Sequence, residues 1–360
     1  MAERIKYIVN ILIVALLVAT VAIQRDARIM GHDVDSLFSQ DSEVEQVVEV
    51  VLDDGTRVIS SAPLAKDVAG FGGRTPVKLY VKDDVIQKVE VEPNSETPSF
   101  FEQVVSSGLL DMWNGLRLSD ALALEVDVVS GATYTSVALT GNIARAVQYA
   151  ANVEAASDGP TLDISFKDIM GVLVILLGVF ITLLRPRNKH IMSLYMVLNI
   201  VVLGFWCGSF LSLTTLTAWM SNGVNLSFSL VTFTLLCVVI ILPLLGKKGS
   251  YCQLHCPMGS AQELLSSVPL TKIKINPKAT KLLNSLRYYI LIVLLFIMWL
   301  GVGFDLMNYE VFSAFIFMSA STFVLVMAGV FLLLSLFIHR PYCRFICPTG
   351  ALITIAQKTK

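Results

Sequence analysis

The sequence is poor in charge: Asp, Glu, Lys and Arg make up only 15% of its 360 residues, whereas 55% are hydrophobic. No charged residue occurs from Ile191 to Gly246. A soluble globular domain rarely has this composition. The basic residues lie at the ends of apolar runs and form no basic patch, which argues against a nucleic-acid partner. The composition predicts a membrane protein whose first partner is the lipid bilayer.

The few charges are unevenly distributed. Residues 25–168 contain 11 Lys and Arg against 24 Asp and Glu, a net charge of −13, and the rest contains 16 against 4, a net charge of +12. An acidic segment of soluble character is thus inserted into a basic, apolar chain, which indicates two compartments. We expect an N-terminal transmembrane anchor over residues 1–24, an exoplasmic domain over 25–168 and a five-span membrane domain over 169–360.

Apolar runs predict six spans of roughly 20 residues each. They are residues 7–23, 169–184, two spans within 191–246, 288–304 and 311–338. The first run could be a cleaved signal peptide, but we favour an uncleaved anchor. With six spans every basic loop falls on one side, which the positive-inside rule makes cytoplasmic. The predicted location is the cytoplasmic membrane, with the acidic segment facing outward.

The acidic segment has the pattern of a mixed domain. Residues 47–60 and 76–92 are rich in Val and Ile and predict strands, while residues 100–110 and 136–152 predict helices. The predicted fold class is therefore an α-helical polytopic membrane protein with six spans and an inserted α+β domain.

One turn of this domain has an unusual run of small residues. Asp127 is followed by Ser130-Gly131-Ala132-Thr133 directly before a predicted helix. Small residues let the backbone approach a ligand, and a helix N-terminus favours a phosphate. A plain turn with Ser and Thr as helix caps is the commoner meaning of so short a pattern.

This turn resembles the flavinylation motif Asp-x-x-Ser/Thr-Gly-Ala-Thr of the FMN-binding domain family, which includes subunits of sodium-pumping quinone reductase and its Rnf relatives. Residues 70–73 and 94–98 are also similar, and the resemblance covers roughly residues 47–150. It implies an FMN esterified through its phosphate to Thr133 and a flavin transferase that attaches it, with Thr135 and Ser136 as alternative attachment residues. The other cofactor-binding residues that it implies are Asp127, Ser130, Gly131, Ala132, Glu96 and Thr97.

Four of the six cysteines form two copies of one pattern. Residues 251–259 read Tyr-Cys-Gln-Leu-His-Cys-Pro-Met-Gly, and residues 342–350 read Tyr-Cys-Arg-Phe-Ile-Cys-Pro-Thr-Gly. Each copy follows an apolar hairpin, so the repeat would bring both loops together on the cytoplasmic face. Four thiolates suit an iron–sulfur cluster or zinc, whereas reduced structural thiols are the plainer alternative. We predict metal ligation, by a 4Fe-4S cluster in preference to zinc, through Cys252, Cys256, Cys343 and Cys347.

The remaining cysteines, Cys207 and Cys237, lie within apolar runs. Small apolar packing is their expected role, because a free cysteine behaves as a buried hydrophobe. A redox pair within the membrane is the alternative. The spans contain almost no ionisable residues, so no proton path is expected.

The combination of FMN domain, spans and two Cys-x-x-x-Cys-Pro motifs resembles NosR-type membrane flavoproteins, and most closely the C-proteins of reductive dehalogenase operons. The resemblance implies anaerobic respiration, with electrons passing from menaquinol or a cytoplasmic donor through FMN to an exoplasmic reductase such as a reductive dehalogenase. Menaquinone and the quinone pool are then a further cofactor and partner. The chain would be an electron-transfer protein rather than a stand-alone enzyme. The alternative is a redox-sensing regulatory or maturation factor for an exoplasmic reductase.

Overall fold

The computed structural model describes residues 2–34, 47–66, 68–94, 96–124, 126–129, 131–152, 165–184, 188–224, 226–273, 276–302, 304–317 and 320–358. The chain divides into two compact units. The helical unit comprises Met1–Gln24, Leu162–Thr217 and Leu226–Lys360, and the sheet unit comprises Arg25–Thr161 and Ala218–Asn225.

Four helical segments of the helical unit are long and apolar enough to cross a membrane. They lie in α1 (Ala2–Asp26), α6 (Phe166–Leu184), α7 (Lys189–Asn199) with its π-helical continuation η2 (Ile200–Trp206), and α11 (Pro277–Trp299). Two further apolar helices, α9 (Leu226–Leu244) and α12 (Thr322–Ser335), have shorter apolar stretches in the described part of the chain. The structure therefore shows four candidate spans, and the prediction of six is not confirmed.

The last predicted span departs most from the structure. Residues 311–338 do not form one long helix: a 3-10 helix, η5 (Val311–Phe315), precedes α12, which begins only at Thr322. The Ser321 hydroxyl caps α12 by accepting a hydrogen bond from Val324 N at 3.4 Å. The 14 residues of α12 extend about 21 Å, which is less than the roughly 30 Å of a hydrocarbon core. The prediction of a long tilted span here is wrong.

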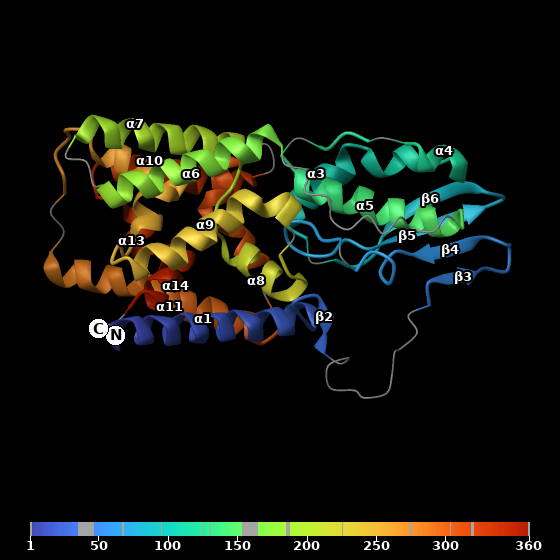
Figure 1. Cartoon of the computed structure of the whole chain (residues 1–360), viewed down its shortest axis with the longest axis horizontal. Coiled ribbons are helices and arrows are strands. Elements are labelled where there is room, and N and C mark those ends of the chain that lie inside the picture. The colour runs from blue at the N-terminus through green and yellow to red at the C-terminus, as the bar shows by residue number, and fades with distance from the viewer. Residues whose placement is uncertain are drawn as a thin grey trace. The chain divides into compact units, whose positions relative to one another are not determined.

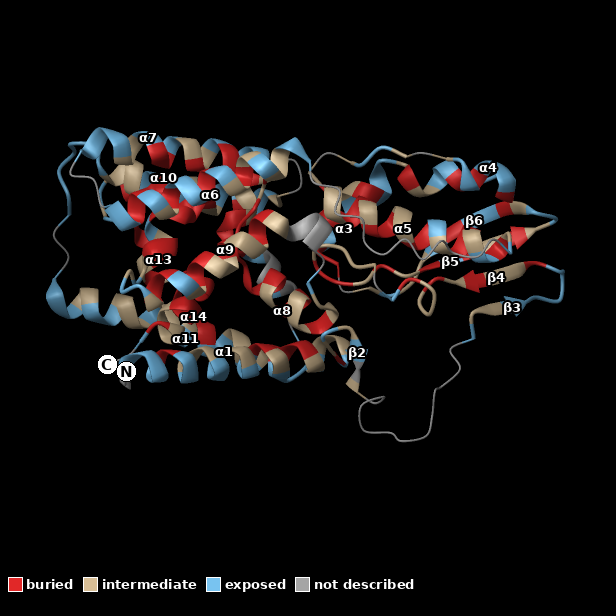
Figure 2. Cartoon of the chain, viewed as in Figure 1, coloured by how far each residue is buried: buried red, intermediate tan, exposed pale blue. Residues whose placement is uncertain are grey.

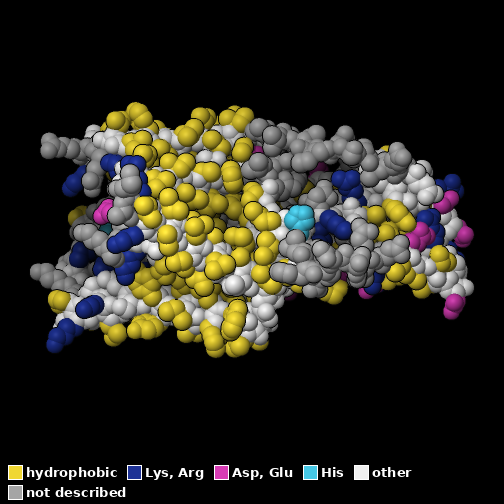
Figure 3. All heavy atoms as spheres, turned by 60° about the horizontal axis from the view of Figure 1, so that its bottom comes forward, with side chains coloured by type: hydrophobic (Ala, Val, Ile, Leu, Met, Phe, Trp, Pro, Cys, Tyr) yellow, Lys and Arg dark blue, Asp and Glu magenta, His cyan; other side chains and the backbone are white. Residues whose placement is uncertain are grey.

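Short helices fill the centre of the helical unit. α10 (Pro257–Ser266) and α14 (Pro348–Ala356) each start with proline, and their first six residues are buried because they pack among the longer helices (Figures 1 and 2). α13 (Pro341–Phe345) lies directly before α14 in the chain. Figure 3 shows a broad hydrophobic band on the surface of this unit, with Lys and Arg gathered at one end of the band. Such a band suits contact with lipid.

The sheet unit has a four-stranded antiparallel sheet in the order β3-β4-β5-β6. The strands are β3 (Glu49–Val51), β4 (Arg57–Ser60), β5 (Val77–Lys82) and β6 (Val85–Val91). Alternate residues of β5 are buried, as period-two alternation requires, and Asp83 and Asp84 form the tight turn to β6 with positive φ. These strands confirm the predicted β-segments. A separate hairpin joins β1 (Arg28–Ile29) to β2 (His32–Asp33).

Helices complete the sheet unit. They are α3 (Pro98–Ser106), the 3-10 helix η1 (Leu109–Trp113), α4 (Leu118–Leu122) and α5 (Thr133–Ala150). The predicted helix over 100–110 is interrupted at Gly108, whose φ of 76° is left-handed. α5 packs on β5 and buries Leu139 and Ile143. Asn142 of α5 also accepts a hydrogen bond from Ser61 Oγ at 2.7 Å, which fixes this helix against the sheet.

Candidate functional site

The predicted flavinylation motif forms the turn into α5. Gly131 has a φ of 86°, a left-handed conformation that glycine adopts without strain. The Ser136 hydroxyl donates to Ala132 O at 2.9 Å and accepts from Val129 N at 3.1 Å. These bonds hold the turn closed so that α5 starts at Thr133. Ser130 lies outside the described residues.

The three hydroxyl groups considered for flavin attachment differ in access. Thr133 is partly exposed in the first position of α5, whereas Thr135 and Ser136 are 0% exposed. The Ser136 hydroxyl is also occupied by the turn. Thr133 is therefore the most accessible of the three hydroxyl groups, and it lies at a helix N-terminus, which favours a phosphate.

Glu96 joins the motif to the glycine-rich loop. Its Oε1 accepts hydrogen bonds from Gly72 N at 2.8 Å and Thr97 N at 3.3 Å. A side chain on Gly70 would place Cβ only 2.1 Å from Glu96 Oε2, so glycine is needed for this close approach. Burial raises the pKa of Glu96 to about 7, against the opposing effect of the two N–H donors.

Glu96 Oε2 and Thr135 Oγ1 are buried beside the motif and form no hydrogen bond of ordinary geometry among the described residues, although the Thr135 hydroxyl is near enough to lower the pKa of Glu96. Buried polar groups normally have a well-formed partner, so these two oxygens leave room for a polar ligand. The Phe71 ring packs edge-on against Phe100 at 5.2 Å and lies 6.4 Å from Tyr134. The structure thus brings the three predicted flavin-binding segments together.

Two further predicted residues lie at this site with different surroundings. Thr97 is 5% exposed and precedes α3. Asp127 is exposed. The assignment of all these residues to FMN binding stays a prediction.

The second candidate site contains the paired cysteines. All four are free thiols; Cys256, Cys343 and Cys347 are buried and Cys252 is half-buried. α10 and α14 draw the chain into the helical unit directly after Cys256 and Cys347.

The two motifs lie close enough for their thiols to influence one another. Burial, and to a smaller extent the neighbouring Cys343, raises the pKa of Cys252 to about 11. Cys343 and Cys252 likewise raise the pKa of both Cys256 and Cys347. Among the described residues, no group of three or more His, Cys, Asp and Glu side chains has the geometry of a closed metal site. The donor set nevertheless suits a cluster, because it comprises four thiols without disulfides, three buried and one half-buried, that affect one another's pKa, and metal coordination deprotonates such thiols.

The sequence repeat is also a structural repeat. The tyrosine before each cysteine pair accepts a backbone hydrogen bond: Tyr251 from Leu211 N at 2.9 Å, and Tyr342 from Val311 N at 3.4 Å. The second cysteine of each pair directly precedes a helix whose first residue is proline, but only the Cys347 side chain accepts a capping hydrogen bond, from Gly350 N. The two motifs therefore share the tyrosine contact and the helix start.

The glycine that ends each motif allows close packing. A Cβ on Gly259 would lie 2.1 Å from Cys252 O, and one on Gly350 would lie 3.2 Å from Cys347 Sγ. Gly350 N also donates to Cys347 Sγ at 3.0 Å. Such N–H donors favour a thiolate at a helix N-terminus.

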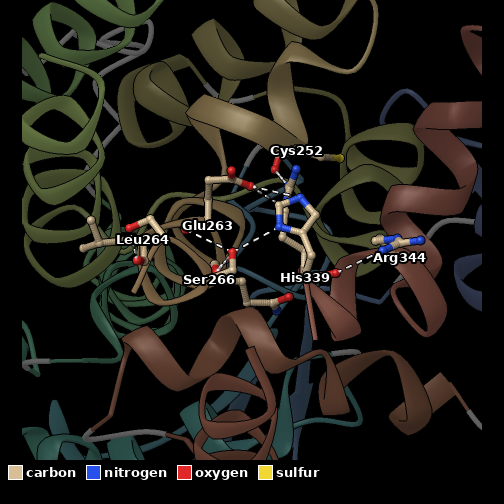
Figure 4. Close-up of polar contacts among 9 residues, drawn as sticks. Cys252, Glu263, Leu264, Ser266, His339 and Arg344 are labelled. Carbon is tan, nitrogen blue, oxygen red and sulfur yellow. Dashed lines mark hydrogen bonds and ion pairs between the residues drawn. The ribbon is translucent and has the colours of Figure 1, made fainter. Parts of the chain in front are cut away.

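Arg340 links the two motifs. Its Nη2 donates to the carbonyl oxygen of Cys252, and its Nε lies 3.6 Å from Glu263 Oε2. Glu263 also lies 3.5 Å from His339 Nε2, and His339 Nδ1 is 3.2 Å from Ser266 Oγ (Figure 4). Arg340 adopts a φ of 50°, a left-handed conformation that is uncommon outside glycine. Its positive charge lowers the pKa of Cys343 against the larger effect of burial.

Glu310 is a site residue that sequence reasoning missed. Its side chain is only 6% exposed. Oε2 accepts from Leu213 N at 3.0 Å, and Oε1 accepts from the hydroxyl of Thr349 within the second cysteine motif. Burial raises its pKa to about 7. The sequence offers no periodic signal for this contact, since Glu310 and Thr349 are 39 residues apart.

His255 and Cys207 are both buried. His255 is 0% exposed, with Nδ1 3.4 Å from Ser250 O, and burial lowers its pKa to about 4. Cys207 is buried, and its thiol donates to Lys167 O at 3.5 Å. Neither contact involves the paired cysteines.

Comparison with known proteins assigns a cofactor to each site. Residues 70–148 match the family described as FMN-binding domain. Residues 228–276 and 320–359 match the family described as 4Fe-4S binding domain, and these segments contain all four paired cysteines. The chain matches no curated protein and no solved structure. It therefore combines an FMN-binding domain with a 4Fe-4S binding domain, which supports a role in flavin and iron–sulfur electron transfer.

Proposed function

We propose that the chain is a NosR-type membrane flavoprotein that transfers electrons from menaquinol or a cytoplasmic donor to an exoplasmic reductase such as a reductive dehalogenase. The observation that carries the proposal is the presence of FMN-binding and 4Fe-4S binding domains in one chain with membrane-length apolar helices. When bound, FMN exchanges one or two electrons and an iron–sulfur cluster exchanges one. This pair suits transfer between a two-electron quinol and one-electron acceptors.

The flavin is proposed to be esterified to Thr133. The partial exposure of this hydroxyl at the start of α5 supports the assignment, as do the buried, occupied hydroxyl of Ser136 and the fully buried Thr135. The exposed Asp127 is proposed as a contact for the flavin transferase. A covalent bond keeps the cofactor on a protein that faces a dilute exoplasmic medium.

The cluster is proposed to be held by the four paired cysteines. Their place inside the helical unit supports electron transfer, because a buried cluster leaves less hydrocarbon to cross than one in an aqueous loop. Arg340 keeps a positive charge beside an anionic centre and joins the two motifs. The second proposed role, a redox sensor or maturation factor, uses the same two sites, but the reduced flavin would then signal to a partner protein instead of passing its electrons to a reductase.

Membrane orientation remains part of the proposal. Lys and Arg gather at one end of the hydrophobic band (Figure 3), which the positive-inside rule favours as cytoplasmic. Tyr7 supports an uncleaved anchor, because it is 4% exposed and its hydroxyl donates to Ile240 O of α9 at 2.9 Å. A segment packed in this way contributes to the folded unit.

The test is flavin reduction in sealed membrane vesicles that contain the full chain. Menaquinol is expected to bleach the flavin absorbance, and Cys347→Ser is expected to slow the bleaching although FMN is still attached. Reoxidation by an added exoplasmic reductase supports electron transfer over sensing. Flavin that neither menaquinol nor a cytoplasmic reductant can reduce would contradict the proposal.

A further inference from the structure

Glu310 occupies an unusual position in the helical unit. Among the Asp and Glu side chains that the structure describes in this unit, it alone is buried. An ionisable group in the interior of a membrane protein is expensive to keep and is commonly functional. Both carboxylate oxygens have one donor each, Leu213 N and the Thr349 hydroxyl. The geometry therefore holds this carboxyl group in one place.

The two donors belong to the first turns of two helices. Leu213 starts α8 (Leu213–Asn222), and Thr349 is the second residue of α14. Helix N-termini and hydrogen-bond donors favour the ionised carboxylate, whereas burial favours the protonated acid. These effects oppose one another, and the pKa of Glu310 is raised to about 7. Both protonation states are thus accessible near neutral pH.

Few other titratable groups face Glu310. They are Tyr342 on α13 and Cys347 before α14, each of which has its pKa raised by the Glu310 charge. On α10, which contacts η5, Glu263 is turned toward Arg340. α8 and α12 contain no titratable residue. A negative charge added at the thiols therefore acts directly on the Glu310 carboxylate.

We propose that Glu310 takes up one proton when the cluster held by the paired cysteines gains one electron, and releases the proton on reoxidation. The electron comes from the quinol or other donor, which is oxidised, and the proton comes from water and forms an O–H bond on the Glu310 carboxylate. The pair of events adds no net charge to a buried region, where an unbalanced charge is costly. The inference rests on the proposed function only in requiring a reducible cluster at these cysteines.

The test is the midpoint potential of the cluster as a function of pH, measured by mediated titration with dithionite on the purified full chain. In the native protein, the potential is expected to fall with pH around neutrality. The slope expected for one proton and one electron is a 59 mV shift per tenfold change in proton activity. Glu310→Gln is expected to remove this slope, because its amide can keep both hydrogen bonds but takes up no proton. Asp168→Asn, which changes an acidic residue outside the site, is the matched control and keeps the slope.

An infrared difference spectrum gives a second readout. Reduction should produce the C=O band of a protonated carboxyl group in the native protein, and Glu310→Gln should lack it. Thr349→Val removes a hydrogen bond that lowers the pKa of Glu310, so it should move the sloping region to higher pH, whereas Thr349→Ser should not. If Glu310→Gln fails to fold, the comparison of Thr349→Val with Thr349→Ser still tests whether Glu310 takes up the proton.

Three results would overturn the inference: a native potential independent of pH, an unchanged slope in Glu310→Gln, or an unmoved pH region in Thr349→Val. Failure of the proposed function would look different. A cluster that dithionite reduces with the predicted slope, but that menaquinol and cytoplasmic reductants do not reduce, would reject the electron donor and retain the role of Glu310.

Discussion

Gly259 is the position at which the cysteine site should tolerate least added volume. A methyl group there would lie 2.1 Å from the carbonyl oxygen of Cys252 and 3.0 Å from Arg340 Nη2, whereas ordinary contact begins at 3.4 Å. The backbone of Cys252 would have to move by roughly 1 Å, while metal sites tolerate deviations of about 0.2 Å in ligand distance. Overpacking costs about 1–3 kcal/mol, and replacing a helical glycine by alanine recovers about 1 kcal/mol. The net loss is up to about 2 kcal/mol.

Gly259→Ala should therefore lose most of its cluster iron and unfold at a lower temperature, although its FMN remains. The assay is iron and acid-labile sulfide per FMN in the purified protein, together with thermal unfolding. Gly329→Ala is the matched control, because a Cβ at this helical glycine meets nothing within 4 Å. The control should keep its iron and its stability. If Gly259→Ala retains iron at the native ratio, the close packing of α10 on Cys252 does not shape the metal site.

Three further predictions concern single residues. Thr133→Ala should abolish flavin fluorescence that survives denaturing electrophoresis, whereas Thr135→Val should retain it; the reverse pattern would place the bond on Thr135. The pKa of Glu96 is raised from 4.5 to about 7, so the unfolded chain ionises first and stability should fall as pH rises between these values. The loss of folding free energy should reach up to about 3 kcal/mol in the native protein and should be absent in Glu96→Gln, as measured by thermal unfolding at several pH values. An equal pH dependence of stability in both proteins would refute this role of Glu96. Arg340→Gln should lower the midpoint potential of the cluster because a positive charge beside the thiols is lost, whereas Arg344→Gln should not; equal potentials in a titration would deny Arg340 this role.

The local features of both sites could be predicted from the sequence because short patterns determine them. The turn of small residues predicts a left-handed glycine and a following helix; Gly131 has a positive φ, and α5 begins at Thr133, three residues before the predicted start at 136. Proline after the second cysteine of each motif predicts a helix start, and α10 and α14 begin there. The alternation of buried residues in β5 is equally local.

Contacts between distant segments could not be predicted in the same way. Nothing in the sequence pairs Glu310 with Thr349, which lies 39 residues away. Hydropathy alone also predicted one span over residues 311–338, because η5 is as apolar as α12. The sequence does not show that η5 forms a separate element, whose Val311 N donates a hydrogen bond to the Tyr342 hydroxyl. The burial of the cysteines depends on the same tertiary packing. Apolar composition shows that a segment avoids water, and cannot tell lipid from protein as its neighbour.

The central claim is that one chain binds FMN and a 4Fe-4S cluster held by the two cysteine motifs. The most direct measurement is the content of iron, acid-labile sulfide, zinc and FMN in the purified native protein and in Cys252→Ser and Cys347→Ser. We predict one FMN together with the iron and sulfide of one 4Fe-4S cluster in the native protein. Both variants should lose iron and sulfide while they keep the flavin. Stoichiometric zinc without iron, or full iron in either variant, would contradict the account.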